Sequence, residues 1–295
     1  MTKTSFIAIV GKPNVGKSSI LNKVLGAKIA IVSSKPQTTR TRIMGVLTVD
    51  ETQLVFTDTP GYHKPHNRLG EYMNNAVGDS IGGTDTVLFV TEPRGELDDK
   101  ELELIDKFKK EKMPVILAIN KIDMLKDKKE LLERIIYLTK LYDFSAVVPV
   151  SAIEGNGMDE LVDEMMKTAF ESPHFFPDDT LTDQPERVLA AEMIREKILR
   201  LMDKEIPHGI AVSIEKMSER KGKPVLDIDA VIYCERETHK GMVIGKQGAM
   251  LKKISTFARQ DLEAFFDVKV NLHTWVKVKE NWRNREGLIH NFGLD

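Results

Sequence analysis

The segment Gly11 to Ser18, GKPNVGKS, follows the apolar run SFIAIV and precedes the helical pattern KSSILNKVLG. This context is the one that a P-loop requires. Glycines let backbone N–H groups turn inward around phosphate oxygens, and the helix N-terminus adds partial positive charge. We expect Lys17 to reach the β- and γ-phosphates of a nucleotide and Ser18 to ligate Mg²⁺. A chance glycine-rich turn is disfavoured because both flanking elements are present.

A second polar segment, DTPG at Asp58 to Gly61, ends the apolar run QLVFT. In a parallel sheet this places Asp58 beside the P-loop, where it can hold Mg²⁺ through a water molecule. Gly61 offers a backbone N–H with little steric bulk for a γ-phosphate. A plain turn is the alternative, and the position after a buried strand disfavours it.

Two further segments predict the base. Asn120, Lys121 and Asp123 of NKID follow PVILAI, and Ser151-Ala152 follows AVVPV. A carboxylate there can accept two hydrogen bonds from the N1–H and 2-amino groups of guanine, whereas adenine has neither donor. The Ala152 N–H is expected to face the guanine oxygen. The sequence therefore predicts GTP and GDP as ligands.

GKPNVGKS, a Thr-Thr-Arg segment, DTPG, NKID and SA occur in the order found in the translation-factor-like GTPases, which this sequence resembles. The resemblance implies that Thr39 of KPQTTRTR meets Mg²⁺ and the γ-phosphate, although spacing alone does not separate it from Thr38. Lys17, Thr39 and Gly61 are then the candidate catalytic residues, and Ser18, Thr39 and Asp58 the candidate metal ligands. The expected nucleotide-binding residues are Gly11, Lys12, Pro13, Asn14, Val15, Gly16, Lys17, Ser18, Ser19, Asp58, Thr59, Pro60, Gly61, Asn120, Lys121, Asp123, Ser151, Ala152 and Ile153.

The sequence departs from the Ras-like pattern at Tyr62, where a glutamine would orient the attacking water. We therefore expect slow intrinsic hydrolysis, with water placed by backbone groups, Thr39 and a cation. Asn14 resembles the P-loop asparagine that supports K⁺ binding in some relatives, and stabilising the loop is an equal alternative. His63 and His66 lack carboxylate or cysteine partners at ligand spacing, which favours solvated loop histidines over a metal pair.

The elements that must position these residues follow from hydrophobic patterning. Five short runs rich in Val, Ile and Leu alternate with helical patterns, and their near-continuous apolar character indicates a parallel sheet covered on both faces. RIMGVLTVD reads as an additional strand beside QLVFTD. The prediction is a doubly wound, mostly parallel α/β domain over residues 1–172. Residues 173–184, rich in proline and aspartate, are expected to form a linker.

Residues 185–280 show the order helix, strand, strand, helix, helix, strand, with VIGKQG joining the adjacent helices, and the domain is expected to span 185–295 with a C-terminal tail. This resembles the smaller α+β type II KH fold, in which G-x-x-G clamps about four single-stranded nucleotides. The residues expected to bind RNA are Val243, Ile244, Gly245, Lys246, Gln247, Gly248, Lys252 and Lys253, the two apolar ones as groove-lining side chains. Residues 240–260 hold five basic residues and no acidic one. In isolation GKQG would read as a helix C-cap turn.

Composition limits the class of protein. The chain of 295 residues has 41% hydrophobic and 30% charged residues and a net charge of −2, which suits two globular domains. A single cysteine, Cys234, provides no internal disulfide and suits a reducing cytosolic setting. No apolar run approaches the roughly 18 residues of a membrane span, and we expect no signal peptide because the first residues read directly into a buried strand.

Over nearly its whole length the chain resembles the Era family of bacterial ribosome-assembly GTPases. The resemblance implies binding to the 3′ end of small-subunit 16S ribosomal RNA and a role in 30S subunit assembly. It also implies a cytoplasmic location and association with the periphery of the cell membrane. We further expect a monomer. Two alternatives remain open: a signalling GTPase whose second domain binds a protein, and an RNA-binding subunit that binds nucleotide without turnover.

Overall fold

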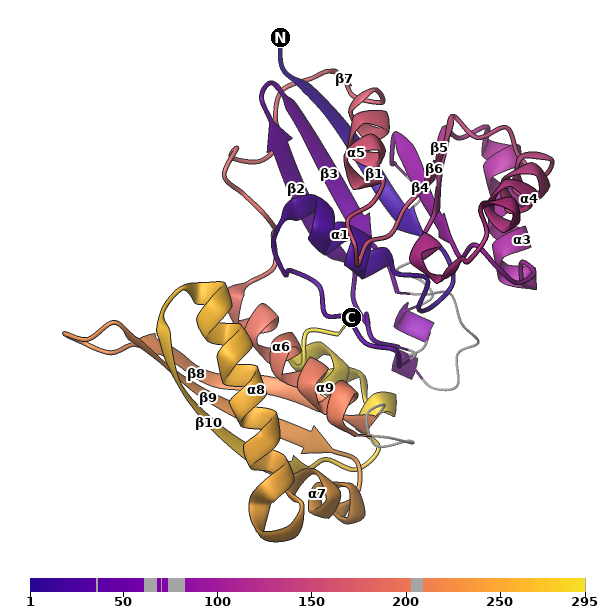
Figure 1. Ribbon diagram of the computed structural model, residues 1–295. Helices are drawn as coiled ribbons and strands as arrows, with labels where there is room; N and C mark the ends of the chain where they lie inside the picture. Colours follow the sequence, from indigo (N-terminus) through magenta and orange to yellow (C-terminus); the bar gives the residue numbers. More distant parts are fainter. Residues whose placement is uncertain (36, 61–67, 70, 74–82, 203–208, 295) are drawn as a thin grey trace. The chain divides into compact units, whose positions relative to one another are not determined.

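The computed structural model describes residues 1–35, 37–60, 68–69, 71–73, 83–202 and 209–294 (Figure 1). These residues divide into two compact units. The first contains the described residues of 1–30, 39–64 and 73–183, and the second contains those of 31–38, 65–72 and 184–295. Residues 31–38 therefore belong with the second unit, although the residues on either side of them in the sequence belong with the first.

The first unit is built on a sheet whose strand order is β2-β3-β1-β4-β5-β6. All neighbouring pairs on this path are parallel except β2, which runs antiparallel to β3. This confirms the predicted mostly parallel sheet, including the additional strand. The strands are β1 (Lys3–Val10), β2 (Ile43–Val49), β3 (Thr52–Asp58), β4 (Thr86–Thr91), β5 (Val115–Ile119) and β6 (Ala146–Pro149).

Helices cover this sheet because its strands are apolar on both faces. The helices are α1 (Lys17–Leu25), α3 (Asp99–Glu111), α4 (Lys128–Thr139) and α5 (Met158–Met166). Phe108 of α3 and Leu138 of α4 are fully buried against one set of strand residues that includes Val10 and Phe89. Figure 1 shows α1 and α5 side by side on the face turned to the viewer.

The segment after α5 follows the edge of this sheet. A short strand, β7 (Phe170–Glu171), which the sequence patterning does not predict, pairs antiparallel with β1. Beyond it, Gln53 donates through Nε2 to the Phe176 carbonyl at 2.9 Å, and the Val46 N–H donates to the Leu181 carbonyl at 2.9 Å. Hydrogen bonds therefore tie much of the proline-rich segment 173–183 to strands of the first unit.

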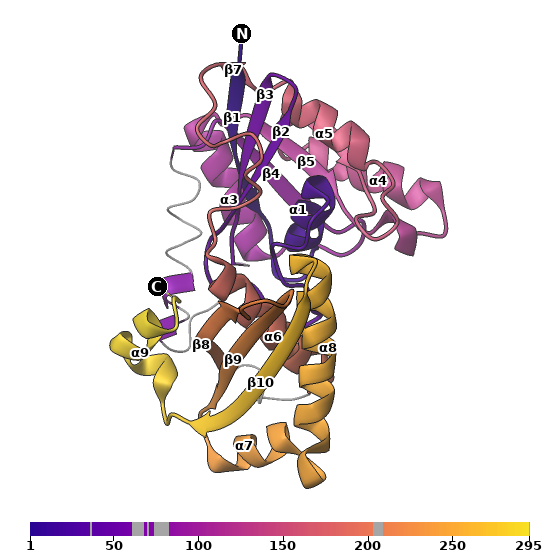
Figure 2. The same cartoon turned by 90° about the vertical axis from the view of Figure 1, so that its left-hand side faces the viewer.

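The second unit has a sheet of order β10-β9-β8, in which β8 and β9 are antiparallel and β10 and β9 parallel (Figure 2). Its elements are α6 (Glu186–Leu201), β8 (Ala211–Glu219), β9 (Val225–Cys234), α7 (Glu237–Ile244), α8 (Ala249–Phe266), β10 (Lys269–Val278) and α9 (Glu286–Asn291). This confirms the predicted helix-strand-strand-helix-helix-strand order. Ile194 and Ile198 of α6 and Leu262 of α8 are fully buried in the shared core.

The two tryptophans of the second unit have different environments. Trp282, in a 3-10 turn over Trp282–Asn284, is fully buried and donates through Nε1 to the Gly209 carbonyl at 3.0 Å. Trp275 on β10 is about half exposed. Across the described residues of both units, no helix combines the length and the apolar character that crossing a membrane would need.

Candidate functional site

The loop between β1 and α1 requires glycine at two positions. Gly11 has φ +146° and Gly16 has φ +101°. A Cβ at Gly11 would lie 2.2 Å from the Val90 carbonyl oxygen, and one at Gly16 would lie 2.1 Å from Nδ2 of Asn120. Helix α1 begins directly after Gly16 with no side-chain cap, so its first N–H groups remain available to an anion.

Lys17 is held at the centre of this loop. Its Nζ donates to the Gly11 carbonyl at 2.9 Å and to the Lys12 carbonyl at 3.1 Å. Burial lowers the pKa of Lys17 to about 8, although the charges of Asp58 and Glu101 oppose the shift. The side chain therefore remains mostly protonated at neutral pH, and a buried cation at a helix N-terminus attracts phosphate.

Three oxygen-bearing side chains converge beside Lys17. Ser18 Oγ donates to Oδ2 of Asp58 at 2.6 Å and lies 3.0 Å from Oγ1 of Thr39. The other Asp58 oxygen, Oδ1, is buried and has no hydrogen-bond partner among the described residues. Burial raises the pKa of Asp58 to about 6, against the effects of Lys17 and Ser18. Hard oxygen donors with an unsatisfied carboxylate oxygen fit Mg²⁺.

The structure separates the two neighbouring threonines. Thr38 Oγ1 donates to the Lys35 carbonyl at 2.6 Å and lies 2.7 Å from Oγ of Ser33. Its hydroxyl is thus occupied within its own segment, whereas the Thr39 hydroxyl lies beside Ser18. Spacing in the sequence could not distinguish them because they are adjacent.

Asn120 joins the P-loop to the turn expected to contact the base. Its Nδ2 donates to the Val15 carbonyl at 2.8 Å, and its Oδ1 accepts the Ala152 N–H at 3.1 Å. The Ala152 N–H, expected to face guanine, is thus directed at Asn120. Asp123 is exposed, and its Oδ1 accepts a hydrogen bond from Ser151 Oγ at 2.6 Å. That bond fixes the orientation of the carboxylate.

Two acidic residues near the site, Glu101 and Glu92, belong to none of the sequence motifs and were not predicted. Glu101 is fully buried at the start of α3, where it forms a capping box with Asp98, and its Oε2 lies 3.8 Å from Nζ of Lys12. Glu92 forms an ion pair with Lys121. A capping-box pattern at Asp98 could have placed Glu101 at a helix start, but only the tertiary structure connects it to the P-loop. Gly61, Tyr62, His63 and His66 lie outside the described residues.

The GKQG loop has the backbone conformation of a tight turn between α7 and α8. Gly245 has φ 71° and ψ 176°, Gln247 has φ 53° and Gly248 has φ 79°. A Cβ at Gly245 would lie 2.7 Å from Cβ of Met250, whereas one at Gly248 would meet nothing within 4 Å. Helix α8 begins at Ala249 without a side-chain cap. The first N–H of α8, that of Ala249, donates instead to the Lys246 carbonyl within the loop.

The side chains around this loop differ from expectation at one position. Val243, expected to line a groove for bases, is fully buried in the core of the second unit, so that expectation is wrong. It is the only buried residue of α7. Ile244 is partly exposed, and Lys246, Lys252 and Lys253 are exposed. The accessible face is therefore basic, with Ile244 as its nearby apolar side chain.

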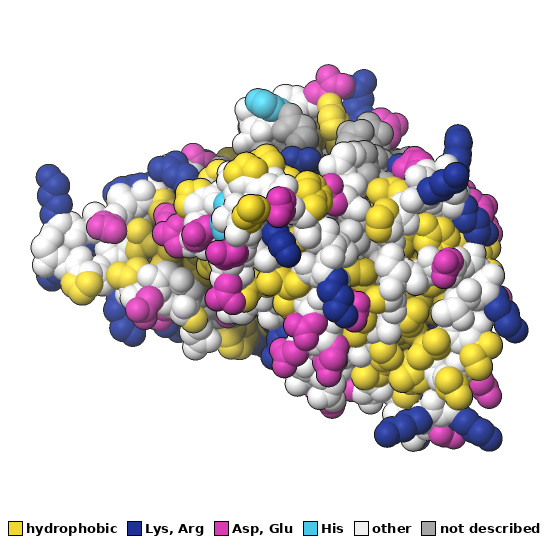
Figure 3. Space-filling model, turned by 90° about the horizontal axis from the view of Figure 1, so that it is seen from above, with side chains coloured by type: hydrophobic (Ala, Val, Ile, Leu, Met, Phe, Trp, Pro, Cys, Tyr) yellow, Lys and Arg dark blue, Asp and Glu magenta, His cyan; other side chains and the backbone are white. Residues whose placement is uncertain are grey.

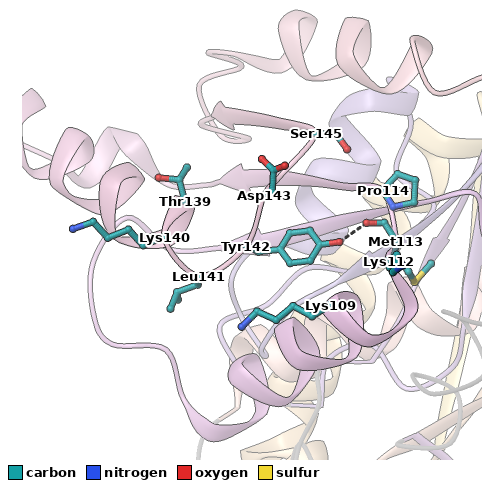
Figure 4. Close-up of a pocket in the computed structure, with 10 residues that line it drawn as sticks. All are labelled: Lys109, Lys112, Met113, Pro114, Thr139, Lys140, Leu141, Tyr142, Asp143 and Ser145. Carbon is teal, nitrogen blue, oxygen red and sulfur yellow. Dashed lines mark hydrogen bonds between the residues drawn. The ribbon is translucent and has the colours of Figure 1, made fainter.

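A separate pocket of about 670 Å³ lies at the opposite, amino-terminal edge of the first sheet (Figure 4). Its floor includes the Tyr142 hydroxyl, which donates to the Met113 carbonyl. Lysines near helix C-termini complement the negative end of each helix dipole, so their presence there needs no ligand. The lining residues are Lys109, Lys112, Met113, Pro114, Thr139, Lys140, Leu141, Tyr142, Asp143 and Ser145.

Figure 3 shows acidic and basic side chains interspersed on the face seen from above, rather than one basic field.

Comparison with known proteins agrees with these observations. Residues 6–121 match the family described as 50S ribosome-binding GTPase, and residues 205–283 match the KH domain family. GTPase Era of Clostridioides difficile is 50% identical over the whole chain and 99% of its own length. GTPase Era of Clostridium kluyveri is 46% identical, with 99% of each chain covered.

Two solved structures share the fold. An Era variant from Aquifex aeolicus bound to GDP·AlF4⁻ matches with a TM-score of 0.94 and 39% identity, covering 99% of each chain. A structure of Era with MgGDPNP and nucleotides 1506–1542 of 16S ribosomal RNA matches with the same TM-score and identity, covering all of this chain and 99% of the other.

Fold and site together define a P-loop GTPase that carries a C-terminal KH domain. Such a protein hydrolyses GTP to GDP and phosphate. With half of its residues identical to a relative of the same length, the chain belongs to the GTPase Era family. This confirms the resemblance seen in the sequence.

Proposed function

We propose that the chain binds the 3′ end of 16S ribosomal RNA through its KH domain and assists maturation of the small ribosomal subunit in a GTP-dependent manner. The observation that carries this proposal is the GKQG loop, a glycine turn at an uncapped helix start surrounded by exposed lysines. The RNA bound to the 39% identical relative supports it. The proposal has three parts: RNA binding, nucleotide binding and the link between them.

The RNA part rests on access to the backbone of the loop. Gly245 and Gly248 have no side chains that would hold a sugar-phosphate chain away. Lys246 and the N-terminal end of α8 supply positive potential. Lys252 and Lys253 lie on the first turns of α8 and are exposed. A loop of this kind grips phosphates and leaves sequence recognition to base edges.

In the nucleotide part, Lys17 neutralises charge on the β- and γ-phosphates, and Gly16 leaves the loop N–H groups accessible. Ser18, Thr39 and Asp58 would hold Mg²⁺, which when bound neutralises charge that develops on the phosphates. Asp123, oriented by Ser151, would accept hydrogen bonds from guanine and so select against adenine. The MgGDPNP complex of the relative supports this assignment.

Slow hydrolysis and a role for K⁺ belong to the same proposal. Asn14 lies in the P-loop in a left-handed conformation with φ 66°, so the backbone of the loop turns at this residue. Single-turnover hydrolysis of GTP should be faster in K⁺ than in Na⁺, and Asn14→Ala should abolish the difference. Equal wild-type rates in the two salts would remove K⁺ from the proposal and leave Asn14 as a loop-stabilising residue.

The expected partners are the small ribosomal subunit and RNA, and the expected state is a monomer in the cytoplasm. The buried, unpaired thiol of Cys234 is consistent with a reducing compartment. Association with the periphery of the membrane follows from the family resemblance alone. Flotation with vesicles and cell fractionation would test it directly.

RNA binding by the loop can be tested with a matched pair of variants. Gly248 and Gly222 both have left-handed backbones, at φ 79° and 74°, and open space around the missing Cβ. Gly222 lies in the turn between β8 and β9. Gly248→Asp places a negative charge at the proposed phosphate site, whereas Gly222→Asp places it elsewhere in the same unit.

Affinity for a single-stranded 16S 3′-end fragment should fall sharply for Gly248→Asp and stay near wild type for Gly222→Asp. The affinity should also fall as salt concentration rises, because phosphate contacts release counterions. Equal affinity of the two variants would refute RNA binding at this loop and would favour a second domain that binds protein. Identical affinity with GDPNP and with GDP would refute the link between nucleotide and RNA.

A further inference from the structure

The turn that carries Asp123 contains a strained residue, Lys121, held by its surroundings. Lys121 has φ +69°, and the 3-10 turn Ile122–Met124 begins directly after it. On the other side of Lys121, the Asn120 N–H donates to the Thr91 carbonyl at 2.9 Å. A left-handed backbone costs free energy in a residue with a Cβ, so this turn persists only because neighbouring groups determine it.

The side chain of Lys121 is held by an ion pair. Its Nζ donates to the Glu92 carboxylate, and the two side chains are 27% and 31% exposed. An ion pair with this exposure contributes little to stability, because water competes for both charges. It does restrict where the Lys121 side chain lies, and the backbone of Lys121 leads directly into the turn with Asp123.

Helix α4 fixes the loop that carries Glu92. Arg134, which is buried, donates from Nη1 to the Gly95 carbonyl at 2.7 Å and from Nε to the Glu92 carbonyl at 3.2 Å. Its Nη2 also donates to Oγ1 of Thr91 at 3.2 Å. One planar guanidinium with donors in a fixed geometry thus holds three points of the chain between β4 and α3. The Glu92 carboxylate therefore meets Lys121 from a backbone that has little freedom.

These contacts lie within the first unit, next to the carboxylate proposed above to bind guanine, that of Asp123. The hydrogen bond from Ser151 orients this carboxylate, whereas the backbone of the turn decides where it lies. A carboxylate that accepts two hydrogen bonds side by side needs close placement, because a displacement weakens at least one of them.

We propose that Glu92 is a positioning residue that determines base specificity: through Lys121 it holds the turn in which Asp123 meets the N1–H and 2-amino groups of guanine. The inference rests on the role proposed above for Asp123. Guanine offers two donors to this carboxylate, and hypoxanthine, which lacks the 2-amino group, offers one. A displaced Asp123 therefore loses more with guanine than with hypoxanthine.

Base specificity is measured on the full chain with Mg²⁺ as the ratio of the affinities for GDP and inosine diphosphate, IDP. The wild type should prefer GDP on the order of 10- to 100-fold, which is the usual effect of one hydrogen bond to a charged group. Glu92→Ala should lower this preference about 5-fold, the lower end of coupling between sites. Glu92→Gln still accepts a hydrogen bond but carries no charge, so it should lower the preference less.

The matched control is Glu164→Ala on α5 of the same unit. Glu164 is 32% exposed and likewise pairs with a lysine, Lys167, at 2.6 Å. This variant should keep the wild-type preference for GDP over IDP. The ratio of GDPNP to GDP affinity should also stay at its wild-type value in Glu92→Ala, because both nucleotides carry the same base. A change in that second ratio would place the effect of Glu92 at the phosphates and overturn the proposal.

Three further outcomes for Glu92→Ala overturn the proposal. Equal weakening of GDP and IDP would show a structural role only, and unchanged affinities would show that Glu92 does not position the turn. A stronger preference for GDP would show that Glu92 holds Lys121 away from its working position.

Asp123→Ala separates the inference from the role on which it rests. If that variant keeps the wild-type preference for GDP over IDP, the assignment of Asp123 to the base fails. If it loses the preference while Glu92→Ala keeps it, the assignment of Asp123 stands and only the role of Glu92 is refuted.

Discussion

The carboxamide of Asn120 is predicted to be a main structural link in the nucleotide site, so Asn120→Ala should destabilise the first unit. The substitution leaves the Val15 carbonyl and the Ala152 N–H without the partners they have at 2.8 Å and 3.1 Å. Val15, Asn120 and Ala152 are all buried, so water does not readily replace the side chain. An unpaired buried polar group costs about 1–3 kcal/mol, which gives about 2–6 kcal/mol for the two groups.

The two units can be followed separately in the measurement. Both tryptophans, Trp275 and Trp282, lie in the second unit, so tryptophan fluorescence during urea unfolding reports on that unit. Hydrogen exchange of peptides from β1 and β5 reports on the first. Asn120→Ala should lower the free energy of opening, measured by hydrogen exchange in β1 and β5, by about 2–6 kcal/mol. It should also weaken GDP binding and leave the fluorescence transition of the second unit unchanged.

The control is Asn156→Ala, which removes an asparagine whose Nδ2 donates to Glu154 at an exposed position. Exposed substitutions of this kind change stability by roughly 0.5 kcal/mol or less. A loss below about 1 kcal/mol for Asn120→Ala, or a loss matching that of Asn156→Ala, would refute the view that Asn120 supports both loops.

Three further predictions concern ionisation and backbone strain. A proton on Asp58 competes with Mg²⁺, and because burial raises the pKa of this group to about 6, Mg²⁺-dependent GDPNP affinity should fall as pH drops from 7 to 5; a flat titration over that range would contradict the assignment. Burial raises the pKa of the Cys234 thiol to about 12, so a thiol reagent at pH 8 should label the native protein very slowly and the urea-unfolded protein quickly, and rapid native labelling would disprove its burial. Gly245→Ala should destabilise the second unit by roughly 1–3 kcal/mol, because the φ and ψ of Gly245 belong to a glycine-only region and the new Cβ meets Met250. Gly248→Ala adds no contact and should cost roughly 1–2 kcal/mol at most. If unfolding followed by tryptophan fluorescence gives the same loss of stability for both variants, the close contact with Met250 is unimportant.

Local patterning in the sequence was enough to predict most of the fold. The strands β1, β3, β4, β5 and β6 are continuous apolar runs, and such runs can be satisfied only inside a covered parallel sheet. The short strand β7 was not predictable, because two exposed residues carry no periodic signal and pair only where β1 offers an edge. The hydrogen bonds of segment 173–183 to the sheet were not predictable either, because their partners are residues more than a hundred positions earlier in the chain.

Single residues show where local reasoning stops. Val243 precedes the glycine loop and looked available to RNA, yet the helical turn of α7 directs it into the core. The resemblance to known GTPases chose Thr39 over Thr38, and the hydrogen bonds of Thr38 to Lys35 and Ser33 supply a physical basis for that choice.

The sequence by itself determined the class of chemistry, because a P-loop, a metal-binding aspartate and a guanine-binding turn are each short segments whose residues act together through local backbone geometry. It also determined the order of elements that makes the second unit a KH fold. Only the tertiary structure decided which distant groups support them. Arg134 lies 42 residues from Glu92 and Asn120 lies 105 residues from Val15, and no pattern along the chain encodes contacts that arise when separate elements pack together.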